Sequence, residues 1–281
     1  MMGVHLFLSP HLDDVVLSCG GTIHQLTERG DQVVVLTVMA GEPSDNLPDT
    51  PSLRAVQARW GAGHLQVSAR RREDLQAARQ LGAKVVHLPL LECIFRTARS
   101  GDGLQTALYP QEDSIFSDYV KADEIRVLLL ESPSCVREGV VTIYAPLCVD
   151  QHIDHRIVRD WALVLTGAKN APTLKFYEEF PSIQNKMALS HVMLFYKQQM
   201  PALSFSQENV GLSEDNVRAK IRAIRSYESH VGVLWHSADA MEKLVRDYLQ
   251  FCGEGRPAEQ FWAVNVTAST DEPARTVDII P

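Results

Sequence analysis

Paired cysteines are missing from this 281-residue sequence. Its five cysteines stand apart from one another, and no two of them have the Cys-x-x-Cys spacing. An odd number of scattered cysteines argues against a disulfide framework and against a zinc site built from thiolates. A GxGxxG loop is missing too: residues 18–22 (SCGGT) fall inside an expected helix, where small residues permit close packing. A nucleotide cofactor is therefore not indicated.

Long apolar runs and excess positive charge are also absent. No uninterrupted apolar stretch is long enough to cross a bilayer, and residues 1–10 (MMGVHLFLSP) lack the basic leader of a signal peptide. Lysine and arginine number 27 against 35 aspartates and glutamates, which gives a net charge of -8. Such a balance repels phosphate backbones and anionic membranes. We therefore expect a cytoplasmic protein without a membrane span or a nucleic-acid partner.

What the chain does contain is an alternation of short apolar runs and helical patterns. Hydrophobic residues make up 45% of it, enough for a large core. β-Branched or apolar runs predict buried strands, and apolar residues at helical spacing lie between them. The expected strands are 4–9, 33–39, 84–88, 140–145 and 174–177, and one of the intervening helices is expected at 123–131. This order predicts an α/β fold, a doubly wound, mostly parallel sheet with helices on both faces.

We expect one domain over residues 1–281, with a core at about 4–178. The part from about 179 to 270 has a less regular pattern, and residues 271–281 look like a frayed tail. Two polar stretches rich in Gly, Pro and Ser, 41–68 and 96–117, predict long loops, which in a compact domain are usually functional or mobile. Trp60 and Tyr109 in these stretches favour a bulky substrate with apolar parts. Exposed apolar loops could equally form a homo-oligomer contact.

Two segments concentrate the reactive side chains. Residues 9–14 (SPHLDD) follow the first expected strand, and residues 150–155 (DQHIDH) follow the strand that ends near Ala145. Ligands of open parallel sheets bind beyond the carboxyl ends of the strands, so the two segments can converge. Either segment alone is commonplace: Asp-Asp at a helix start is usually a cap, and His-x-x-His is usually on the surface. Together, at the same sheet edge, they favour a metal site.

The types and spacing of these residues fit a catalytic zinc. Imidazole nitrogen and carboxylate oxygen suit Zn²⁺, and catalytic zinc usually has three protein ligands and one open position. His11 and Asp14 are three residues apart, so a tight turn can aim both at one point, and His155 would complete the set. Similar sites accept Fe²⁺ or Co²⁺. Asp13 then stays free as a general base, while His152, paired with Asp154 as an imidazolium, would stabilise an oxyanion or protonate a leaving amine.

These residues resemble a known family. Residues 10–15 (PHLDDV) resemble the Pro-His-Pro-Asp-Asp-Glu signature of the PIG-L/LmbE-like de-N-acetylases, and residues 152–155 (HIDH) resemble that family's His-Pro-Asp-His. Residues 70–73 (RRRE) are similar to its Arg-x-x-Glu motif. The resemblance covers about residues 4–178 and continues more faintly through 220–230 (KIRAIRSYESH) and 259–261 (EQF).

The resemblance implies a Rossmann-like fold and hydrolysis of N-acetylglucosamine-type amides. By position in the family motifs, the zinc ligands are His11, Asp14 and His155, the general base is Asp13, His152 stabilises the oxyanion with Asp154 as its modulating partner, and Arg70 holds the sugar. The chain departs from the motif at Leu12 and Val15. Neither replaces a ligand, but the missing glutamate at Val15 is expected to change the rim of the site.

We therefore expect a metal-dependent hydrolase that removes an acetyl or similar acyl group from an N-acylated amino-sugar conjugate. Its role would lie in thiol-cofactor or glycolipid biosynthesis, or in the tailoring of a secondary metabolite, which the long loops favour. One alternative is a non-catalytic sugar-binding or regulatory domain on the same fold. The other is a metal-dependent esterase or phosphoesterase, although two-metal phosphoesterases need more ligands than the single set seen here.

Overall fold

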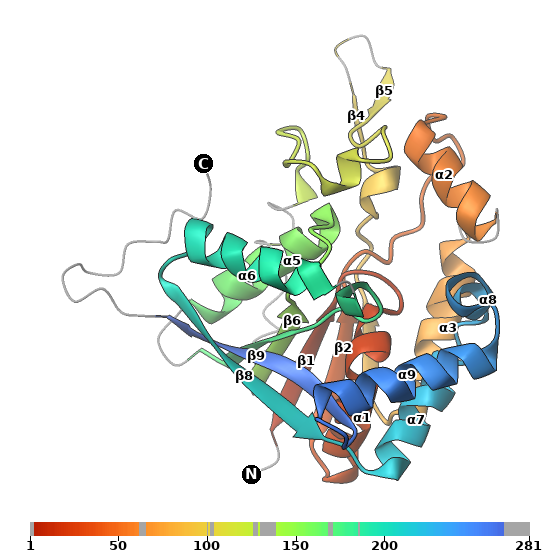
Figure 1. The fold of residues 1–281 in the computed structure, drawn as a ribbon. Helices are drawn as coiled ribbons and strands as arrows, with labels where there is room; N and C mark the ends of the chain where they lie inside the picture. Colours follow the sequence, from red (N-terminus) through yellow and green to blue (C-terminus); the bar gives the residue numbers. More distant parts are fainter. Residues whose placement is uncertain are drawn as a thin grey trace.

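A seven-stranded sheet runs through the middle of the molecule (Figure 1). The computed structural model describes residues 3–266 apart from 62–65, 100, 102–103, 126–128, 130–138, 168–170 and 185. The strand order is β3-β2-β1-β6-β7-β9-β8. The strands of this sheet are β1 (Val4–Ser9), β2 (Gln32–Thr37), β3 (Lys84–His87), β6 (Val140–Pro146), β7 (Thr173–Tyr177), β8 (Leu203–Gly211) and β9 (Ala258–Val266).

Five of these strands are parallel, and the last two are not. β1 pairs in parallel with β2 and β6, β2 with β3, and β6 with β7. β9 is antiparallel to β7, and β8 is antiparallel to β9. A separate hairpin joins β4 (Thr97–Arg99) and β5 (Gln105–Ala107). The predicted doubly wound, mostly parallel sheet is confirmed, with an antiparallel extension built from the last third of the chain.

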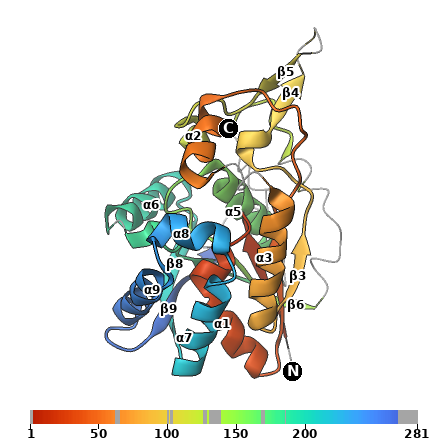
Figure 2. The ribbon, with the colours of Figure 1, turned by 90° about the vertical axis from the view of Figure 1, so that its right-hand side faces the viewer.

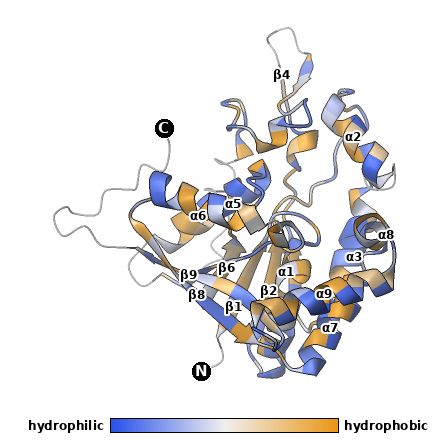
Figure 3. Cartoon of the chain, in the orientation of Figure 1, coloured by the Kyte–Doolittle hydropathy of each residue, from blue (hydrophilic) through white to orange (hydrophobic). Residues whose placement is uncertain are grey.

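Helices cover both faces of the sheet, and strand side chains alternate between two cores. Leu6 and Leu8 of β1 pack into one core with residues of α5 and α6, whereas Phe7 packs into the other with α1, α3, α7 and α9. The central strands accordingly consist mostly of hydrophobic residues, as their colour in Figure 3 shows. The helices are α1 (Asp14–Glu28), α2 (Pro51–Trp60), α3 (Val67–Gln80), α5 (Ile153–Thr166), α6 (Lys186–Gln199), α7 (Glu214–Ile224), α8 (Glu228–Trp235) and α9 (Ala238–Cys252).

Both long loops contain secondary structure that the sequence pattern did not predict. The stretch 41–68 includes α2, whose N-cap Thr50 accepts a hydrogen bond from the backbone N–H of Leu53 and is followed by Pro51. This Thr-Pro pair is a helix start signal that the surrounding Gly and Pro residues obscured. The stretch 96–117 includes the β4–β5 hairpin. Figure 2 shows α2 and this hairpin together at one end of the molecule.

The last third of the chain is more regular than expected. Its described residues form the helices α6, α7, α8 and α9 and the strands β8 and β9, and β9 extends the main sheet beside β7. The helix expected at 123–131 falls largely outside the described residues. Cys19, Cys93, Cys148 and Cys252 are free thiols, and Cys135 lies outside the described part of the chain. No helix in that part has the length and hydropathy needed to span a bilayer.

A buried ion pair between α7 and β9 forms hydrogen bonds with the backbone of α1. Lys220 of α7 donates to Glu259 of β9 at 2.6 Å and to the backbone carbonyl of Ser18 at 2.9 Å. Glu259 in turn accepts from the backbone N–H groups of Gly21 and Thr22. A Cβ at Gly21 would lie 3.1 Å from Oε1 of Glu259 and 2.4 Å from a methyl group of Leu212. The small residues of the SCGGT segment thus permit close packing, as expected.

The point where the strand order reverses positions the reactive segments. β1 and β6 are neighbours, yet the chain continues from β1 towards β2 on one side and from β6 towards β7 on the other. The helices that follow such strands leave on opposite faces, which opens a crevice beyond the carboxyl ends. Residues 9–14 leave β1 at this crevice, and residues 150–155 leave β6 there.

Candidate metal and hydrolase site

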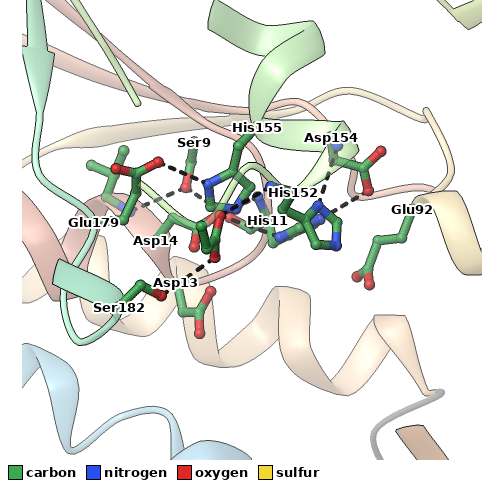
Figure 4. Close-up of polar contacts among 12 residues, drawn as sticks. Ser9, His11, Asp13, Asp14, Glu92, His152, Asp154, His155, Glu179 and Ser182 are labelled. Carbon is green, nitrogen blue, oxygen red and sulfur yellow. Dashed lines mark hydrogen bonds and ion pairs between the residues drawn. The ribbon is translucent and has the colours of Figure 1, made fainter. Parts of the chain in front are cut away.

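Three of the predicted residues lie close together, with two histidines facing one oxygen of an aspartate. Oδ2 of Asp14 lies 3.5 Å from Nδ1 of His11 and 3.5 Å from Nε2 of His155 (Figure 4). Asp14 is the first residue of α1 and His155 lies in the first turn of α5, so two helix starts hold these groups in place. The structure therefore brings together residues that are about half the chain apart.

The far nitrogen of each histidine contacts a carboxylate. Nε2 of His11 lies 3.0 Å from Oδ2 of Asp154, and Nδ1 of His155 lies 3.2 Å from Oε1 of Glu179. In a neutral ring that donates its N–H to the carboxylate, the other nitrogen keeps a lone pair that can bind a metal. Those are the two nitrogens that face Asp14. This carboxylate–histidine arrangement is typical of imidazoles that bind a metal.

The donor set fits a single divalent cation. Zn–N and Zn–O bonds of about 2.0–2.1 Å in a tetrahedral site place neighbouring donors about 3.3 Å apart. The two 3.5 Å separations at Asp14 are close to that value. They are also too long to be strong hydrogen bonds. A ring nitrogen of His152 lies within 4.8 Å of those of His11 and His155, so it adjoins the same position.

His152 has a different role in the structure from the predicted imidazolium. It is the N-cap of α5, and its Nδ1 accepts the backbone N–H of Asp154 at 3.2 Å. A nitrogen that accepts a hydrogen bond carries no proton, so the ring is neutral and its proton is on Nε2. Burial lowers the pKa of His152 to about 4. The predicted imidazolium is therefore wrong, because the backbone occupies the second nitrogen.

The Asp154 carboxylate contacts His11 and Arg96. Oδ1 accepts from Nη1 of Arg96 at 2.6 Å, and Oδ2 accepts from the backbone N–H of Cys93 at 2.9 Å as well as facing His11. Burial, which would raise the pKa of Asp154, is outweighed by Arg96 and His11, so the pKa lies well below its usual value. The predicted side-chain pairing of Asp154 with His152 is thus corrected: the carboxylate orients a different histidine.

Asp13 lies beside the converging residues and faces the same space (Figure 4). Burial and the neighbouring charge of Asp14 raise its pKa well above the usual value. Its Oδ2 lies 3.3 Å from Nε2 of His230, a buried residue of α8. Arg70 lies nearby on α3, where its guanidinium donates to Glu92 at 2.6 Å. The roles of Asp13 as base and of Arg70 as sugar ligand stay predictions.

A cavity of about 900 Å³ opens above these residues. One part of its wall is apolar and comes from α2, α8 and the segments near β4, including Val56, Trp60, Ile94, Phe116 and Trp235. The charged part of the described lining is mostly acidic: Asp13, Asp14, Glu92, Glu112, Asp150, Asp154 and Glu179 stand against Arg59 and Arg70. Trp60 thus lines the cavity as expected. Tyr109 does not line it, because its ring is buried and its hydroxyl donates to Asp123.

Leu12 and Val15 pack in the interior. Both are fully buried, Leu12 in the core beside α5 and Val15 in the core beside α7, and neither lines the cavity. The expected change at the rim of the site is therefore wrong, because the position of Val15 faces apolar neighbours.

Four contributors were not predicted from the sequence. Glu179 comes two residues after β7, at the same sheet edge as the other reactive segments, so the strand-end argument could have found it. Glu92 and Arg96 lie in connecting segments with no pattern that points to the site. His230 ends the stretch 220–230, over which the family resemblance is faint.

Comparison with known proteins agrees with this geometry. The family model described as GlcNAc-PI de-N-acetylase, PIG-L, matches residues 6–165, which is more than half of the chain. The chain belongs to the PIG-L family. The resemblance seen in the two motifs is thereby confirmed, and both motifs lie inside the matched segment.

Two curated relatives, both described by the same activity, match part of the chain. A 2'-N-acetylparomamine deacetylase of Niallia circulans is 33% identical over 190 residues, which is 63% of this PIG-L chain and 66% of the relative. Another from Streptomyces fradiae is 31% identical over 182 residues, 64% of this chain and 57% of the relative. Both matches thus span less than two thirds of the relative's own length.

Solved structures share the fold over almost the whole chain. The zinc-inhibited form of teicoplanin deacetylase Orf2 superposes with a TM-score of 0.70 and 24% identity, covering 96% of this chain and 100% of that one. N,N'-diacetylchitobiose deacetylase of Pyrococcus horikoshii gives a TM-score of 0.57 at 18% identity, with 94% and 84% covered. The fold shared with these structures therefore extends beyond the segment that the family model matches.

Proposed function

We propose that this protein is a metal-dependent hydrolase that removes the acetyl group from an N-acetylated amino-sugar conjugate. The observation that carries the proposal is the convergence of His11, Asp14 and His155, with Asp13 beside them, at the floor of a large cavity. Membership of the PIG-L family and the names of both curated relatives support an amide as the bond that is cleaved.

A divalent cation held by His11, Asp14 and His155, zinc in the first instance, would polarise the acyl carbonyl and make a water molecule more acidic. Asp13 faces the same space and is the carboxylate that accepts the proton of the attacking water. The Nε2–H of His152 is a donor for the acyl oxygen as negative charge develops on it. Nδ1 of His152 is held by the backbone N–H of Asp154, and Nε2 lies 3.9 Å from Sγ of Cys93, another residue of the cavity lining.

The cavity favours a substrate that carries free amino groups. Seven acidic side chains and two arginines line its described part, and one arginine, Arg70, is paired with Glu92. Asp154 is paired with Arg96 and a bound divalent cation would offset two further charges, and the acidic groups that remain attract cations. We therefore place the substrate among amine-bearing sugar conjugates such as acetylated paromamine, the compound named for both relatives, and not among phosphatidylinositol glycolipids. The apolar wall at Trp60 and Phe116 would hold the acetyl or ring carbons.

Metal content tests the site directly. Elemental analysis of the purified protein should give about one zinc, iron or cobalt per chain. Asp14→Ala should lose most of this metal, whereas Asp13→Asn should retain it and lose most turnover. A wild-type protein that binds no divalent cation, even after incubation with zinc, would contradict the hydrolase proposal. Because a structural relative was crystallised in a zinc-inhibited form, activity is measured with stoichiometric metal and without excess zinc.

A substrate panel tests the bond and the charge preference. Acetylated paromamine, N-acetylglucosamine, N-acetylglucosaminyl phosphatidylinositol and an O-acetyl ester of paromamine are compared by amine or acetate release. We expect acetylated paromamine to have the highest kcat/KM. Glu112→Gln, at an exposed position of the lining, should raise its KM and leave the KM of neutral N-acetylglucosamine unchanged. Faster cleavage of the glycolipid, or of the ester, would contradict the proposed substrate class.

A further inference from the structure

A chain of polar contacts runs from the surface of α3 to Asp13. Glu73 of α3 accepts from both the hydroxyl and the backbone N–H of Ser229. The Ser229 hydroxyl lies 2.8 Å from Nδ1 of His230, and Nε2 of His230 lies 3.3 Å from Oδ2 of Asp13. The two sequence motifs that the proposed mechanism leaves without a full account, residues 70–73 and 220–230, meet in this chain of contacts.

The direction of the hydrogen bonds follows from the groups involved. The Ser229 hydroxyl has one hydrogen, and the Glu73 carboxylate can only accept it. The Ser229 oxygen must then accept a hydrogen from Nδ1 of His230. This bond fixes the plane of the imidazole and leaves Nε2 directed at Asp13. Nε2 and Oδ2 then lie 3.3 Å apart, close enough for a polar contact.

Packing holds the histidine in this orientation. His230 is 2% exposed, and its ring lies 5.0 Å from that of Trp60 and 5.9 Å from that of Tyr227. The Tyr227 hydroxyl donates to Asp74, a neighbour of Glu73 on α3. The side chain of His230 is therefore fixed by contacts from α2, α3 and α8, and the atom that these contacts aim at the cavity is Nε2.

We propose that His230 is a positioning residue for Asp13. By engaging Oδ2, it fixes the rotation of the carboxylate, so that Oδ1 is the oxygen presented to the attacking water. A base that is held in one orientation loses less rate to misalignment than one that rotates freely. The inference rests on the proposed function, because that function makes Asp13 the general base.

The test compares three variants of the metal-loaded enzyme with the wild type. His230→Ala removes the donor, and His230→Gln keeps an N–H at a similar reach. His87→Gln is the matched control, because His87 also contacts a carboxylate of α3, Asp74 at 2.7 Å, but does not line the cavity. We expect His230→Ala to lower kcat about 10- to 100-fold with KM and metal content unchanged. His230→Gln should restore most of the rate, and His87→Gln should match the wild type.

Two results would overturn the inference: an unchanged kcat in His230→Ala, or equal losses in the Ala and Gln variants, which would mean that packing alone is at stake. A readout independent of turnover separates this from the proposed function. In ¹⁵N spectra of the histidine rings, Asp13→Asn should shift Nε2 of His230 and leave His87 unmoved. An unmoved His230 signal would contradict the contact, whereas a wild type that hydrolyses no substrate would contradict only the deacetylase function.

Discussion

Replacing Asp154 by asparagine should weaken metal binding at a residue that is not itself a predicted ligand. Oδ2 of Asp154 faces Nε2 of His11 and the backbone N–H of Cys93, and Oδ1 faces Arg96. All three partners are donors, and an amide has only one acceptor atom. If the amide NH₂ faces His11, the ring must accept at Nε2, and its proton moves to Nδ1. Nδ1 is the atom that faces Asp14 and the metal position.

The size of the effect follows from the two orientations of the amide. Losing a carboxylate behind a ligating histidine typically costs 10- to 100-fold in metal affinity, or about 1.4–2.7 kcal/mol. The opposite orientation spares His11 but directs two donors at each other beside the buried Arg96. The lost charge-assisted hydrogen bond then costs about 1.5–3 kcal/mol of folding stability. Asp154→Asn should therefore lose metal affinity, stability or both.

Metal affinity is measured by competition with a chromophoric chelator, and stability by urea unfolding of the chelated protein, so that bound metal adds nothing to the folding free energy. Asp160→Asn is the control: Asp160 is a buried carboxylate on the same helix α5 that accepts from Arg159 and Tyr119. The control should lose stability without losing metal affinity. Unchanged affinity and stability in Asp154→Asn, or an equal loss of affinity in both variants, would refute the reasoning.

Three substitutions outside the cavity lining test the packing of α1 and the helix propensity of α8. Lys220→Met leaves Glu259 charged and buried without its cation, so it should cost about 3–5 kcal/mol in urea unfolding; a normal midpoint would contradict this. Gly21→Ala places a methyl group 2.4 Å from Leu212 and should destabilise by about 1–3 kcal/mol. Gly232→Ala in α8 meets no atom within 4 Å and should stabilise by about 0.5–1 kcal/mol. Opposite signs in thermal unfolding are expected for the two glycine variants.

The sheet and the two reactive segments could be predicted because their signals are local. The VHLFLS and VVTIYA runs are buried strands in any parallel sheet, and the polar segments that follow them must lie at its carboxyl edge. This was enough to predict that His11, Asp14 and His155 would meet. The antiparallel pairing of β9 with β7 could not be predicted in the same way, because it depends on which edge of the sheet remains free.

The partners of the reactive residues depend on distant parts of the chain. Asp154 was expected to pair with His152, two residues away, but its carboxylate bonds to Arg96 from a segment expected to be a loop. Local spacing cannot show that a buried guanidinium competes for the same oxygen. The same limit applies to His230, whose contact with Asp13 joins residues more than 200 positions apart. This contact is set by how α8 packs on α2 and by the hydrogen bond of Ser229 to Glu73 of α3.

The ion pair that contacts the backbone of α1 has a consequence for where the chain can be truncated. The segment that matches the family model ends at residue 165, and it contains the whole of α1 and every proposed ligand. Yet the backbone of α1 at Ser18, Gly21 and Thr22 is bonded by Lys220 and Glu259, which lie far beyond that segment. A fragment cut at the family boundary would leave these backbone groups open to water in the helix that begins with Asp14. The unit that folds is therefore longer than the segment that carries the proposed metal ligands.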